Sequence, residues 1–433
     1  MKKIFLLFTL LFSSIFAGER ADLIVAKDDS GDFLKIQDAL DAVPKGNEKL
    51  FIILVKDGLY KEKLIIRESN IAIVGESKEK TIIQFAEIRK KWMESHDNHF
   101  GSAVVNIAAN TTDITLANLT IHNNYGSLYG DDDHQYAILG LGTKVILIHC
   151  NVIADGADTV SLWPEDGGMF YHSHCYFEGH VDYVCPRGWC YITDSKFFGH
   201  NLTASLWHKG IDDKSAKFVI RYSYFDGVKG FPLGRHHYDA QFYLLDCIFS
   251  ENMADIPIFW PVSPNAHVWE WGTRHYFHNC QRLGGDYKWF ENNLSSAEDS
   301  PAPGMVTAKW TFDGKWDPET EMPRILPFTF LPKPRNGEYL NSTNTLLTWV
   351  PSRNAESFDV YFWKSKYPQA LDFGEKLKDG PSAPGKPVFV NNQNSNIFDP
   401  GKLQPNSTYY WRIDELIDGK KVEGKLWHFT TPE

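Results

Sequence analysis

Three polar side chains recur at nearly equal intervals in the middle of this 433-residue chain. Gln135 precedes Asp158 by 23 residues, and Asp158 precedes Asp182 by 24. If this interval is one structural repeat, the two aspartates lie on neighbouring layers, about 5 Å apart. Like charges at that distance cannot both ionise at low cost, so the pKa of one carboxyl rises, which separates an acid from a base or nucleophile. Arg235, 53 residues after Asp182, could hold one carboxylate ionised through a charge-assisted bond.

The residues around these side chains contain an internal repeat. In each unit a small or polar residue precedes an apolar strand, and a glycine often ends the unit; the small or polar residues are Asn118, Cys150, Cys175, Ser195, Ser223 and Cys247. Coils of roughly 20–30 residues with short strands and Gly, Asn or Asp turns are typical of a right-handed parallel β-helix, in which equivalent residues stack. Without such a repeat, the aspartates would be ordinary turn residues and Arg235 a solvated side chain.

The six cysteines allow two interpretations. As members of an interior ladder they behave as small hydrophobic side chains. As disulfides in an oxidising compartment they would link the coils, and Cys185 and Cys190 are then the first pair to test. The chain contains no CxxC pair and no HExxH motif, so the sequence predicts no metal site.

Three further segments flank the predicted β-helix. Residues 1–17 have the charged start, the apolar run and the small final residue of a secretory signal peptide, so we expect a secreted or periplasmic protein that is not a lipoprotein. Residues 33–44 have the apolar periodicity of a short helix that could cap one end of the coils. Residues 326–433 contain short alternating strands between prolines. The predicted fold class is therefore all-β, a right-handed parallel β-helix followed by a small β-sandwich.

Composition limits the function classes. Hydrophobic residues make up 43% of the chain and charged residues 23%, as in ordinary globular proteins. The net charge of -11 argues against nucleic-acid binding, because phosphate contacts need clustered Lys and Arg. After the signal peptide no segment is long and apolar enough to predict a membrane span. Aromatic residues reach 14%, which fits either a sugar-binding surface or a large aromatic core. We expect a monomer.

Several ordered motifs resemble those of the pectin methylesterase (pectinesterase) family. They are Ser30–Ala39, Gly58–Leu64, Asn70–Glu76, Gln135–Ile138, Ala157–Thr159, Gly179–Val184 and Leu233–Arg235. The similarity covers residues 22–325, and several motifs in the right order are more specific than any one of them. Residues 326–433 resemble a fibronectin type III module, for which a spacer role is preferred to glycan binding.

The resemblance implies an activity and a role for each spaced side chain. The implied reaction is hydrolysis of methyl esters of a uronic-acid polysaccharide, polygalacturonate, without a metal or other cofactor. Asp182 is implied to be the nucleophile, and Asp158 the general acid and then the general base. Arg235 is implied to orient Asp182, and Gln135 to help bind the oxyanion.

Two departures from the family pattern put parts of this assignment in question. Ala157 replaces a glutamine that donates to the oxyanion, and the loss of one such donor costs about 10²–10³ in rate. His180, Arg187 and the backbone around Ala157 are candidates to replace it. His236–His237 stands where the family has Pro-Trp, which gives a smaller and more polar platform for a sugar. We therefore expect His180, His236 and His237 to contact substrate, and an altered glycan preference.

Two other function classes remain open at this point. The departures at Ala157 and His237 also fit a β-helix that binds a plant or algal glycan with weakened or lost catalysis. A polysaccharide lyase is less favoured, because lyases usually need Ca²⁺ held by clustered acids. Residues 131–133, three consecutive aspartates, are the only acidic run that invites a cation, and we interpret them as an exposed turn.

Overall fold

The computed structural model describes residues 21–261, 271–364 and 386–433. The chain divides into two compact units, which separate between Met322 and Pro323. The sequence-based boundary, between residues 325 and 326, lies close to this division. The predicted signal peptide, residues 1–17, lies outside the described residues.

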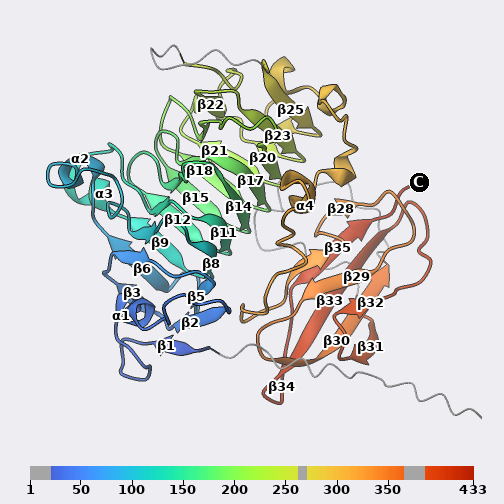
Figure 1. Ribbon diagram of the computed structural model, residues 1–433. Helices are drawn as coiled ribbons and strands as arrows, with labels where there is room; N and C mark the ends of the chain where they lie inside the picture. Colours follow the sequence, from blue (N-terminus) through green and yellow to red (C-terminus); the bar gives the residue numbers. More distant parts are fainter. Residues whose placement is uncertain (1–20, 262–270, 365–385) are drawn as a thin grey trace, which may run out of the picture. The chain divides into compact units, whose positions relative to one another are not determined.

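The first unit consists of three parallel sheets (Figure 1). The ten-stranded sheet contains, in spatial order, β1 (Leu23–Val25), β2 (Phe51–Val55), β5 (Ile71–Gly75), β8 (Thr112–Ala117), β11 (Thr143–Ile148), β14 (Gly168–Ser173), β17 (Gly188–Thr193), β20 (Phe218–Arg221), β23 (Gln241–Leu245) and β25 (Arg274–His278). The nine-stranded sheet contains β26 (Gln281–Arg282), β24 (Ile248–Phe249), β21 (Tyr224–Gly227), β18 (Lys196–Gly199), β15 (Tyr176–Gly179), β12 (Asn151–Ala154), β9 (Thr120–Asn123), β6 (Thr81–Phe85) and β3 (Gly58–Tyr60). The seven-stranded sheet contains β22 (Gly234–His236), β19 (Leu206–His208), β16 (Val184–Pro186), β13 (Val160–Leu162), β10 (Ile138–Gly140), β7 (Val105–Ile107) and β4 (Leu64–Ile66).

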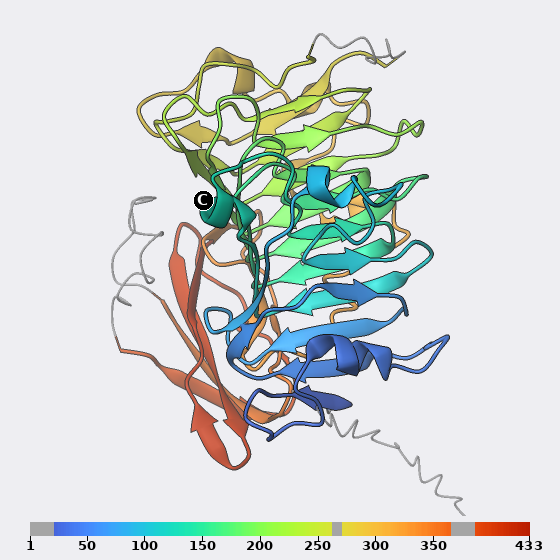
Figure 2. The ribbon, with the colours of Figure 1, turned by 90° about the vertical axis from the view of Figure 1, so that its left-hand side faces the viewer.

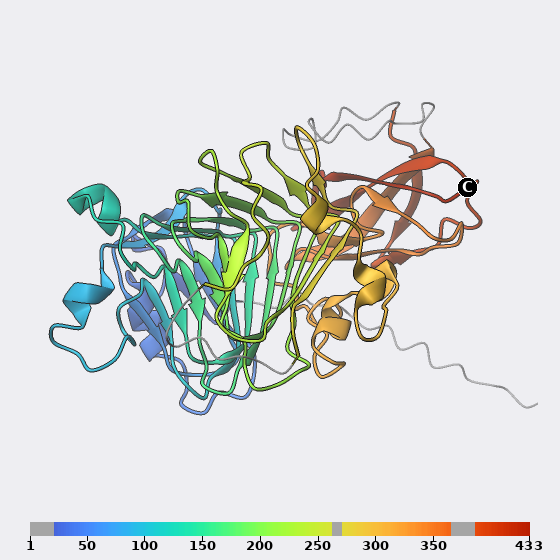
Figure 3. The same cartoon turned by 90° about the horizontal axis from the view of Figure 1, so that it is seen from above.

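Each central coil contributes one strand to each sheet, as β11, β12 and β13 do before the next coil begins at β14. Figure 2 shows the strands stacked coil upon coil, and Figure 3 shows the same stack from above. A single coil cannot bury its inner face, so stacking with its neighbours supplies the apolar core. The predicted parallel β-helix is therefore confirmed.

The corner between the ten-stranded and nine-stranded sheets explains the sequence repeat. It has two residues, of which the first has a positive φ and the second is buried. His149, His174 and Asp194 have φ of 52°, 56° and 52°, and the next residues, Cys150 and Cys175 among them, point into the core. Among residues other than glycine, Asn, Asp and His adopt this left-handed conformation most readily, so a polar residue followed by a small one marks several of the corners.

The first member of the predicted ladder is wrong by one residue. Asn118 has φ of 56° and is the left-handed corner residue, and its Oδ1 lies 2.9 Å from Nδ1 of His149, the next corner residue. Thr120 pairs with Asn151, so Leu119 lies level with Cys150. The prediction failed there because a corner residue and a ladder residue can both be small and polar.

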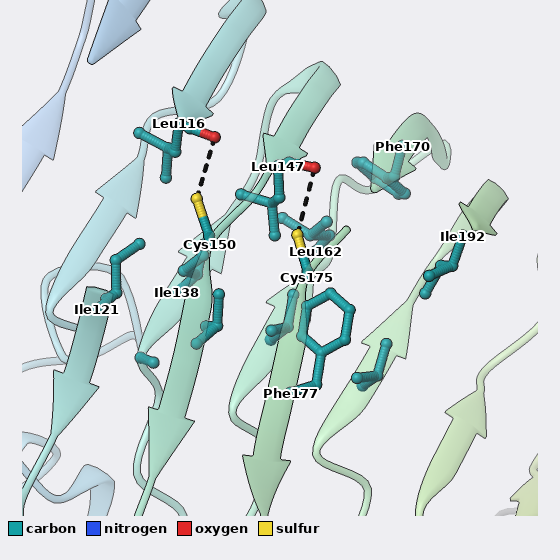
Figure 4. Packing of buried hydrophobic residues seen from close by; sticks show 14 of the residues in the cluster. Leu116, Ile121, Ile138, Leu147, Cys150, Leu162, Phe170, Cys175, Phe177 and Ile192 are labelled. Atoms are coloured by element: carbon teal, nitrogen blue, oxygen red, sulfur yellow. Dashed lines mark hydrogen bonds between the residues drawn. The ribbon is translucent and has the colours of Figure 1, made fainter. Parts of the chain in front are cut away.

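The cysteines follow the interior interpretation, since all six are buried and free. Cys150 and Cys175 each donate to a backbone carbonyl of the ten-stranded sheet, at 3.3 and 3.4 Å (Figure 4). The alternative of a Cys185–Cys190 disulfide is wrong, because the two residues lie on strands of different sheets and face different surroundings. The Sγ of Cys185 is 3.2 Å from Oγ of Ser161, whereas Cys190 belongs to the apolar core.

The helix expected within residues 33–44 is present as α1 (Ile36–Asp41). Its apolar face is buried, and the helix packs against β1, β2 and β4 at the N-terminal end of the coils. The carboxylate of Glu62 accepts hydrogen bonds from the backbone N–H groups of Ile36 and Gln37, at 3.2 and 3.1 Å. These bonds satisfy donors that the start of a helix leaves without partners.

The remaining helices are short. α2 (Arg89–Trp92) and α3 (Tyr125–Tyr129) lie on neighbouring loops that leave the coils (Figure 1). η1 (Lys288–Phe290) and η2 (Leu294–Ser296) pack against β25, near the C-terminal end of the β-helix. They are followed by η3 (Pro303–Met305) and by α4 (Ala308–Thr311), which packs against β17. Across the described ranges, no helix is long and apolar enough to span a membrane.

The second unit is a small β-sandwich of two sheets. One sheet contains β27 (Phe330–Lys333), β29 (Leu347–Val350) and β32 (Ile397–Phe398). The other contains β28 (Glu338–Tyr339), β35 (Leu426–Thr430), β33 (Thr408–Ile417), β30 (Ala355–Lys364) and β31 (Phe389–Gln393), with β34 (Lys420–Val422) paired to β33. Both sheets contribute to one core, which includes Leu347 and Trp349 from the first and Val360, Trp411 and Phe429 from the second.

A stack of buried phenylalanines on the nine-stranded sheet generates a stability prediction. The ring of Phe197 lies 5.3 Å from that of Phe177 and 4.2 Å from that of Phe225. We expect Phe197→Ala to lower the free energy of unfolding by about 3–5 kcal/mol, because it leaves a cavity between two coils. The control is Phe198→Ala on the same strand, whose half-buried ring faces the other way, and which should cost clearly less. Urea unfolding of both variants measures the difference, and equal losses would contradict a coil core held by this stack.

Candidate active site

Gln135, Asp158 and Asp182 lie just before three successive strands of the seven-stranded sheet. The N–H of Gln135 donates to the carbonyl of Ala157, and the N–H of Asp158 donates to the carbonyl of Val181, both at 2.9 Å. The N–H of Gln135 thus bonds to the residue before Asp158, and the N–H of Asp158 bonds to the residue before Asp182. A bond repeated in this way between parallel strands stacks equivalent residues. The three side chains therefore occupy equivalent positions on successive coils, as their spacing predicts.

The two aspartates are buried in left-handed backbone. Asp158 and Asp182 have φ of 64° and 56°, and each is only 6% exposed. Burial raises the pKa of Asp158 well above its ordinary value, and the neighbouring charge of Asp182 raises it further. Burial also raises the pKa of Asp182, but there the guanidinium of Arg235 opposes it. The charges of Arg89 and Arg235 lower the pKa of Asp158 in part, but Arg235 forms its hydrogen bonds with Asp182.

Arg235 makes a two-pronged ion pair with Asp182 from β22, two coils farther along. Its Nε donates to Oδ1 at 3.0 Å, and its Nη2 donates to Oδ2 at 2.6 Å. The planar fork matches the carboxylate geometry and favours the ionised form of Asp182. We infer that Asp182 carries the charge of the pair and that Asp158 carries the proton.

His134 also contacts this pair, and the sequence analysis did not identify it. Its Nε2 lies 3.4 Å from Oδ2 of Asp158, and its Nδ1 bonds to the carboxylate of Asp133. Burial lowers the pKa of His134, so the ring is neutral near pH 7. A neutral ring that faces a carboxylate through Nδ1 carries its proton there, which leaves Nε2 as an acceptor directed at Asp158.

The side chain of Gln135 and the N–H of Ala157 are already hydrogen-bonded to backbone groups, which leaves fewer donors for an oxyanion. The Oε1 of Gln135 accepts from the N–H of Gly126 at 2.9 Å, and its Nε2 donates to the carbonyl of Asp131. The N–H of Ala157 donates to the carbonyls of residues 132 and 133, at 3.2 and 3.3 Å. The backbone at Ala157, one expected replacement for the missing glutamine, is therefore already bonded to the loop that precedes β10 on the neighbouring coil.

The structure separates the three histidines that were expected to contact substrate. The ring of His237 lies 5.3 Å from that of Trp207, which is level with Arg235 on the neighbouring strand. His237 therefore lies beside Arg235. His180 lies to one side, where it stacks on His200 and its Nδ1 is 3.4 Å from a carboxylate oxygen of Asp132. It is therefore directed at a neighbouring loop rather than at Asp158.

The expectation for His236 is wrong. Side chains alternate along a strand, so on β22 the side chain of His236 points to the opposite face from that of Arg235. His236 is buried, its Nδ1 lies 2.6 Å from the carbonyl oxygen of Tyr238, and its ring packs against Phe242 and His275. It supports the interior of the coil and does not face the site.

An aromatic wall adjoins the carboxyl pair. Its rings are those of Tyr136, Trp163 and Trp207, with neighbouring centroids 5.6 and 6.2 Å apart. Tyr136 follows Gln135 directly and is fully buried, and its hydroxyl oxygen lies 3.0 Å from Nδ1 of His99. Burial raises the pKa of Tyr136, so its hydroxyl stays protonated. These rings come from different coils, and no single sequence motif joins them.

The acidic run at residues 131–133 does not form a cluster. Asp131 pairs with Lys90, Asp132 faces His180, and Asp133 pairs with His134. In the part of the chain that the structure describes, no group of three or more His, Cys, Asp or Glu side chains is placed to hold a metal ion.

Comparison with known proteins supports the resemblance found in the sequence. Residues 22–202, which contain Gln135, Asp158 and Asp182 but not Arg235, match the pectinesterase family model. Probable pectinesterase 56 of Arabidopsis thaliana is 30% identical over 171 residues, 39% of this chain and 55% of that protein. A pectinesterase of Petunia integrifolia is 30% identical over 182 residues, 42% of this chain and 45% of that protein. The chain thus spans about half the length of these curated relatives.

Solved structures share the fold of the first unit. A pectin methylesterase from Erwinia chrysanthemi aligns with a TM-score of 0.57 at 20% identity, over 70% of this chain and 99% of that one. A pectin methylesterase from carrot aligns with a TM-score of 0.56 at 19% identity, over 70% of this chain and 97% of that one. At such low identity the likeness establishes the β-helix fold and leaves the role of each side chain to the geometry.

The ion pair between Arg235 and Asp182 predicts a pH-dependent loss of stability. Arg235→Gln leaves a buried carboxylate without its cation, which costs about 3–5 kcal/mol when the carboxylate is charged. Burial then raises the pKa of Asp182 without opposition, so the loss is large at pH 7 and shrinks as Asp182 becomes protonated toward pH 4. Denaturant unfolding at the two pH values measures this change.

The double variant Asp182→Asn with Arg235→Gln is the control, because it removes the buried charge along with its partner. Its loss of stability relative to the native chain should be smaller and should vary little between pH 4 and pH 7. The same loss at both pH values in Arg235→Gln would show that the pair does not hold a buried charge.

Proposed function

We propose that this chain is a carbohydrate esterase that hydrolyses methyl esters of a pectin-like uronan, with Asp182 as nucleophile and Asp158 as general acid and base. The observation that carries the proposal is the buried pair: Arg235 favours the charge on Asp182, whereas burial and Asp182 favour the proton on Asp158. The pectinesterase match over residues 22–202 supports the substrate class. A pectin methylesterase solved in complex with a hexasaccharide shares the fold, with a TM-score of 0.56.

The proposed reaction uses each carboxyl in the state that its surroundings favour. The ionised Asp182 attacks the ester carbonyl carbon, and a bond forms between its carboxylate oxygen and that carbon. When the tetrahedral intermediate collapses, the bond from carbon to the methoxy oxygen breaks, and Asp158 gives its proton to the departing methanol. Water then attacks the acyl carbon while Asp158 takes a proton from it, and the bond from that carbon to the oxygen of Asp182 breaks. The uronate carboxyl is released, and both aspartates return to their starting states.

The oxyanion of the intermediate requires donors other than residue 157. The Nε2 of Gln135 carries two hydrogens, and its bond to the carbonyl of Asp131 uses one of them. We assign the other to the oxyanion, which is the role that the family resemblance implies for Gln135. With Ala157 as its neighbour the site has fewer side-chain donors, so we expect a slower esterase.

His134 is proposed to keep the proton on Asp158. Its Nδ1–H is bound to Asp133, and its Nε2 lies 3.4 Å from Oδ2 of Asp158, so a small approach would let it accept from the protonated carboxyl. A hydrogen bond to the neutral form of an acid raises the pKa of that acid. The arrangement therefore extends the pH range in which Asp158 can protonate methanol.

The two other function classes are less well supported. A protein that only binds glycans has no need for two buried carboxyls whose surroundings favour different protonation states, since that arrangement destabilises the fold. A lyase of the Ca²⁺-dependent type would need its acids gathered together, whereas the aspartates at 131–133 face three different basic side chains.

We also propose that the protein is exported and that the second unit is a fibronectin type III-like spacer. Export follows from the signal-peptide pattern of residues 1–17. The module assignment is supported by the two-sheet core and by a corner at the start of β33, where the hydroxyl of Tyr409 accepts from the N–H of Gln404 at 2.9 Å. A tyrosine that bonds back to the upstream backbone is a common feature of immunoglobulin-like sandwiches.

The direct test is methanol release from highly methylated pectin. We expect Asp182→Asn to reduce the rate by about 10³-fold or more, because the amide cannot act as the nucleophile. The control is Asp194→Asn, which changes another left-handed aspartate at a corner away from this site and should retain activity. The native activity should persist in EDTA. Methanol release that survives Asp182→Asn would overturn the proposal, and an unsaturated product that absorbs in the ultraviolet would indicate a lyase.

The role of His134 predicts a shift in the pH profile. The active form needs a protonated Asp158, so the alkaline limb of kcat/KM follows the pKa of that group. We expect His134→Leu, which removes the acceptor, to move this limb to lower pH by about one unit, as the loss of one hydrogen bond of about 1 kcal/mol implies. His134→Gln keeps an acceptor and should restore most of the range. His180→Leu should leave the limb in place, and an unshifted limb in His134→Leu would show that His134 has only a structural role.

A further inference from the structure

Arg89 is a cation beside the carboxyl pair to which the proposed mechanism gives no task. It is half-buried and is the first residue of α2, on a loop that leaves the coils after β6. In the ranges that the structure describes, Arg89 forms no ion pair, because the carboxylates of its own and the adjoining loop have other partners. These pairs are Glu87 with Lys63, Asp131 with Lys90 and Asp133 with His134.

Hydrogen bonds hold the loop of Arg89 against the loop that carries His134. The N–H of Arg89 donates to the carbonyl of His134 at 3.0 Å. Asn123 joins the same two segments: its Nδ2 donates to the carbonyls of Glu87 and Tyr136, at 2.9 and 3.0 Å, and its Oδ1 accepts from the N–H of Glu87 at 3.2 Å. The backbone of Arg89 is therefore anchored to the segment that enters β10 at the catalytic site.

The guanidinium of Arg89 acts on the groups of the catalytic site. It interacts with the hydroxyl of Tyr136, whose ring belongs to the aromatic wall. Burial raises the pKa of Asp158, and of the cations that oppose this rise Arg89 has a larger effect than Arg235. Burial lowers the pKa of His134, and the charge of Arg89 lowers it further. A cation that acts on all three of these groups lies at the catalytic site.

The other side chains that could replace the donor missing at Ala157 are directed elsewhere. The Nδ1 of His180 is 3.4 Å from a carboxylate oxygen of Asp132. Arg187 follows β16, whose other end adjoins the carboxyl pair, and its guanidinium lies over the ring of Trp163, 4.8 Å from the ring centre. Neither of these two side chains faces the position of the reacting ester.

We propose that Arg89 is a catalytic residue that stabilises the oxyanion of the tetrahedral intermediate in place of a glutamine at position 157. This role rests on the proposed function. As Asp182 attacks, negative charge develops on the ester carbonyl oxygen, and Arg89 donates hydrogen bonds to it beside the amide of Gln135. Arg89 keeps its own protons, because a guanidinium does not deprotonate in proteins. The neutral ester gains less from a cation than the oxyanion does, so Arg89 contributes to kcat rather than to binding.

Arg89 compensates only in part for Ala157. Its side chain is half-buried, so water and salt weaken its attraction for the oxyanion relative to that of a group enclosed in the site. Arg235 cannot share this task, since its Nε and Nη2 are both bonded to the carboxylate of Asp182. The esterase is therefore still expected to be slower than one that has the glutamine.

Methanol release by Arg89→Met tests this role. We expect kcat to fall by about 10²-fold, the lower end of the range for one oxyanion donor, with KM nearly unchanged, and Arg89→Lys to restore part of the rate. Rates are compared at the plateau of each pH profile, because Arg89 also acts on Asp158. The control Arg67→Met removes an exposed arginine after β4 and should retain activity. A raised KM with unchanged kcat would assign Arg89 to polymer binding and overturn the proposal.

A second background separates replacement of the glutamine from a general effect on folding. Ala157→Gln restores the amide donor, so adding Arg89→Met to that variant should lower kcat by a clearly smaller factor than in the native chain. The same factor in both backgrounds would overturn the proposal. An active native chain whose kcat is unaffected by Arg89→Met would overturn the role of Arg89 alone. A native chain that releases no methanol would overturn the proposed function, and this role with it.

Discussion

The hydrogen bonds that stack one coil on the next fix the distance between the two aspartates. Parallel strands lie about 4.8 Å apart, and the bonds from the N–H groups of Gln135 and Asp158 hold their coils at this spacing. The carboxyls of Asp158 and Asp182 therefore cannot relax apart to reduce their repulsion. Two charges at this separation in a buried site are costly, so the structure must neutralise one and pair the other. Arg235 provides the pairing, and a proton on Asp158 provides the neutralisation.

The alignment of Gln135, Asp158 and Asp182 could be predicted because it depends only on the number of residues in one coil. A coil of a β-helix returns to the same point after a nearly constant number of residues, so Gln135, Asp158 and Asp182 show their alignment in the sequence itself. Arg235 follows the same rule over two coils. The error at Asn118 has the opposite cause, since a left-handed corner and the ladder position beside it both accept small polar residues and only the register distinguishes them.

Other site residues could not be predicted, because their positions depend on where loops travel or on which face of a short strand they occupy. His134 belongs to a loop whose path alone brings Nε2 to Asp158. Trp163 and Trp207 lie on different coils and meet through side-chain packing. His236 was misplaced because a three-residue strand gives little periodicity, although its position next to Arg235 already required the opposite face once β22 was located.

The departures from the family pattern fall on one side of the site, and the structure offers partial substitutes there. His237 gives less aromatic surface than the tryptophan that pectinesterases have at the matching position, but Trp207 and Trp163 present indoles beside it. The missing donor at Ala157 has no such substitute in the backbone of that residue, because its N–H is bonded to carbonyls of residues 132 and 133 on the neighbouring coil. The surface for binding is thus better preserved than the groups that stabilise the intermediate, and the proposed esterase would hold its polymer well and turn it over slowly.

The charge distribution is consistent with such an enzyme. The chain has a net charge of -11, and a field of that sign opposes the approach of an anionic polymer at long range. Screening limits this repulsion to about 8–10 Å at physiological salt. Under the proposed function, a polymer whose carboxyls are esterified is neutral and experiences little of it. The de-esterified product carries a charge on each unit, so the field opposes rebinding of product more than the approach of substrate.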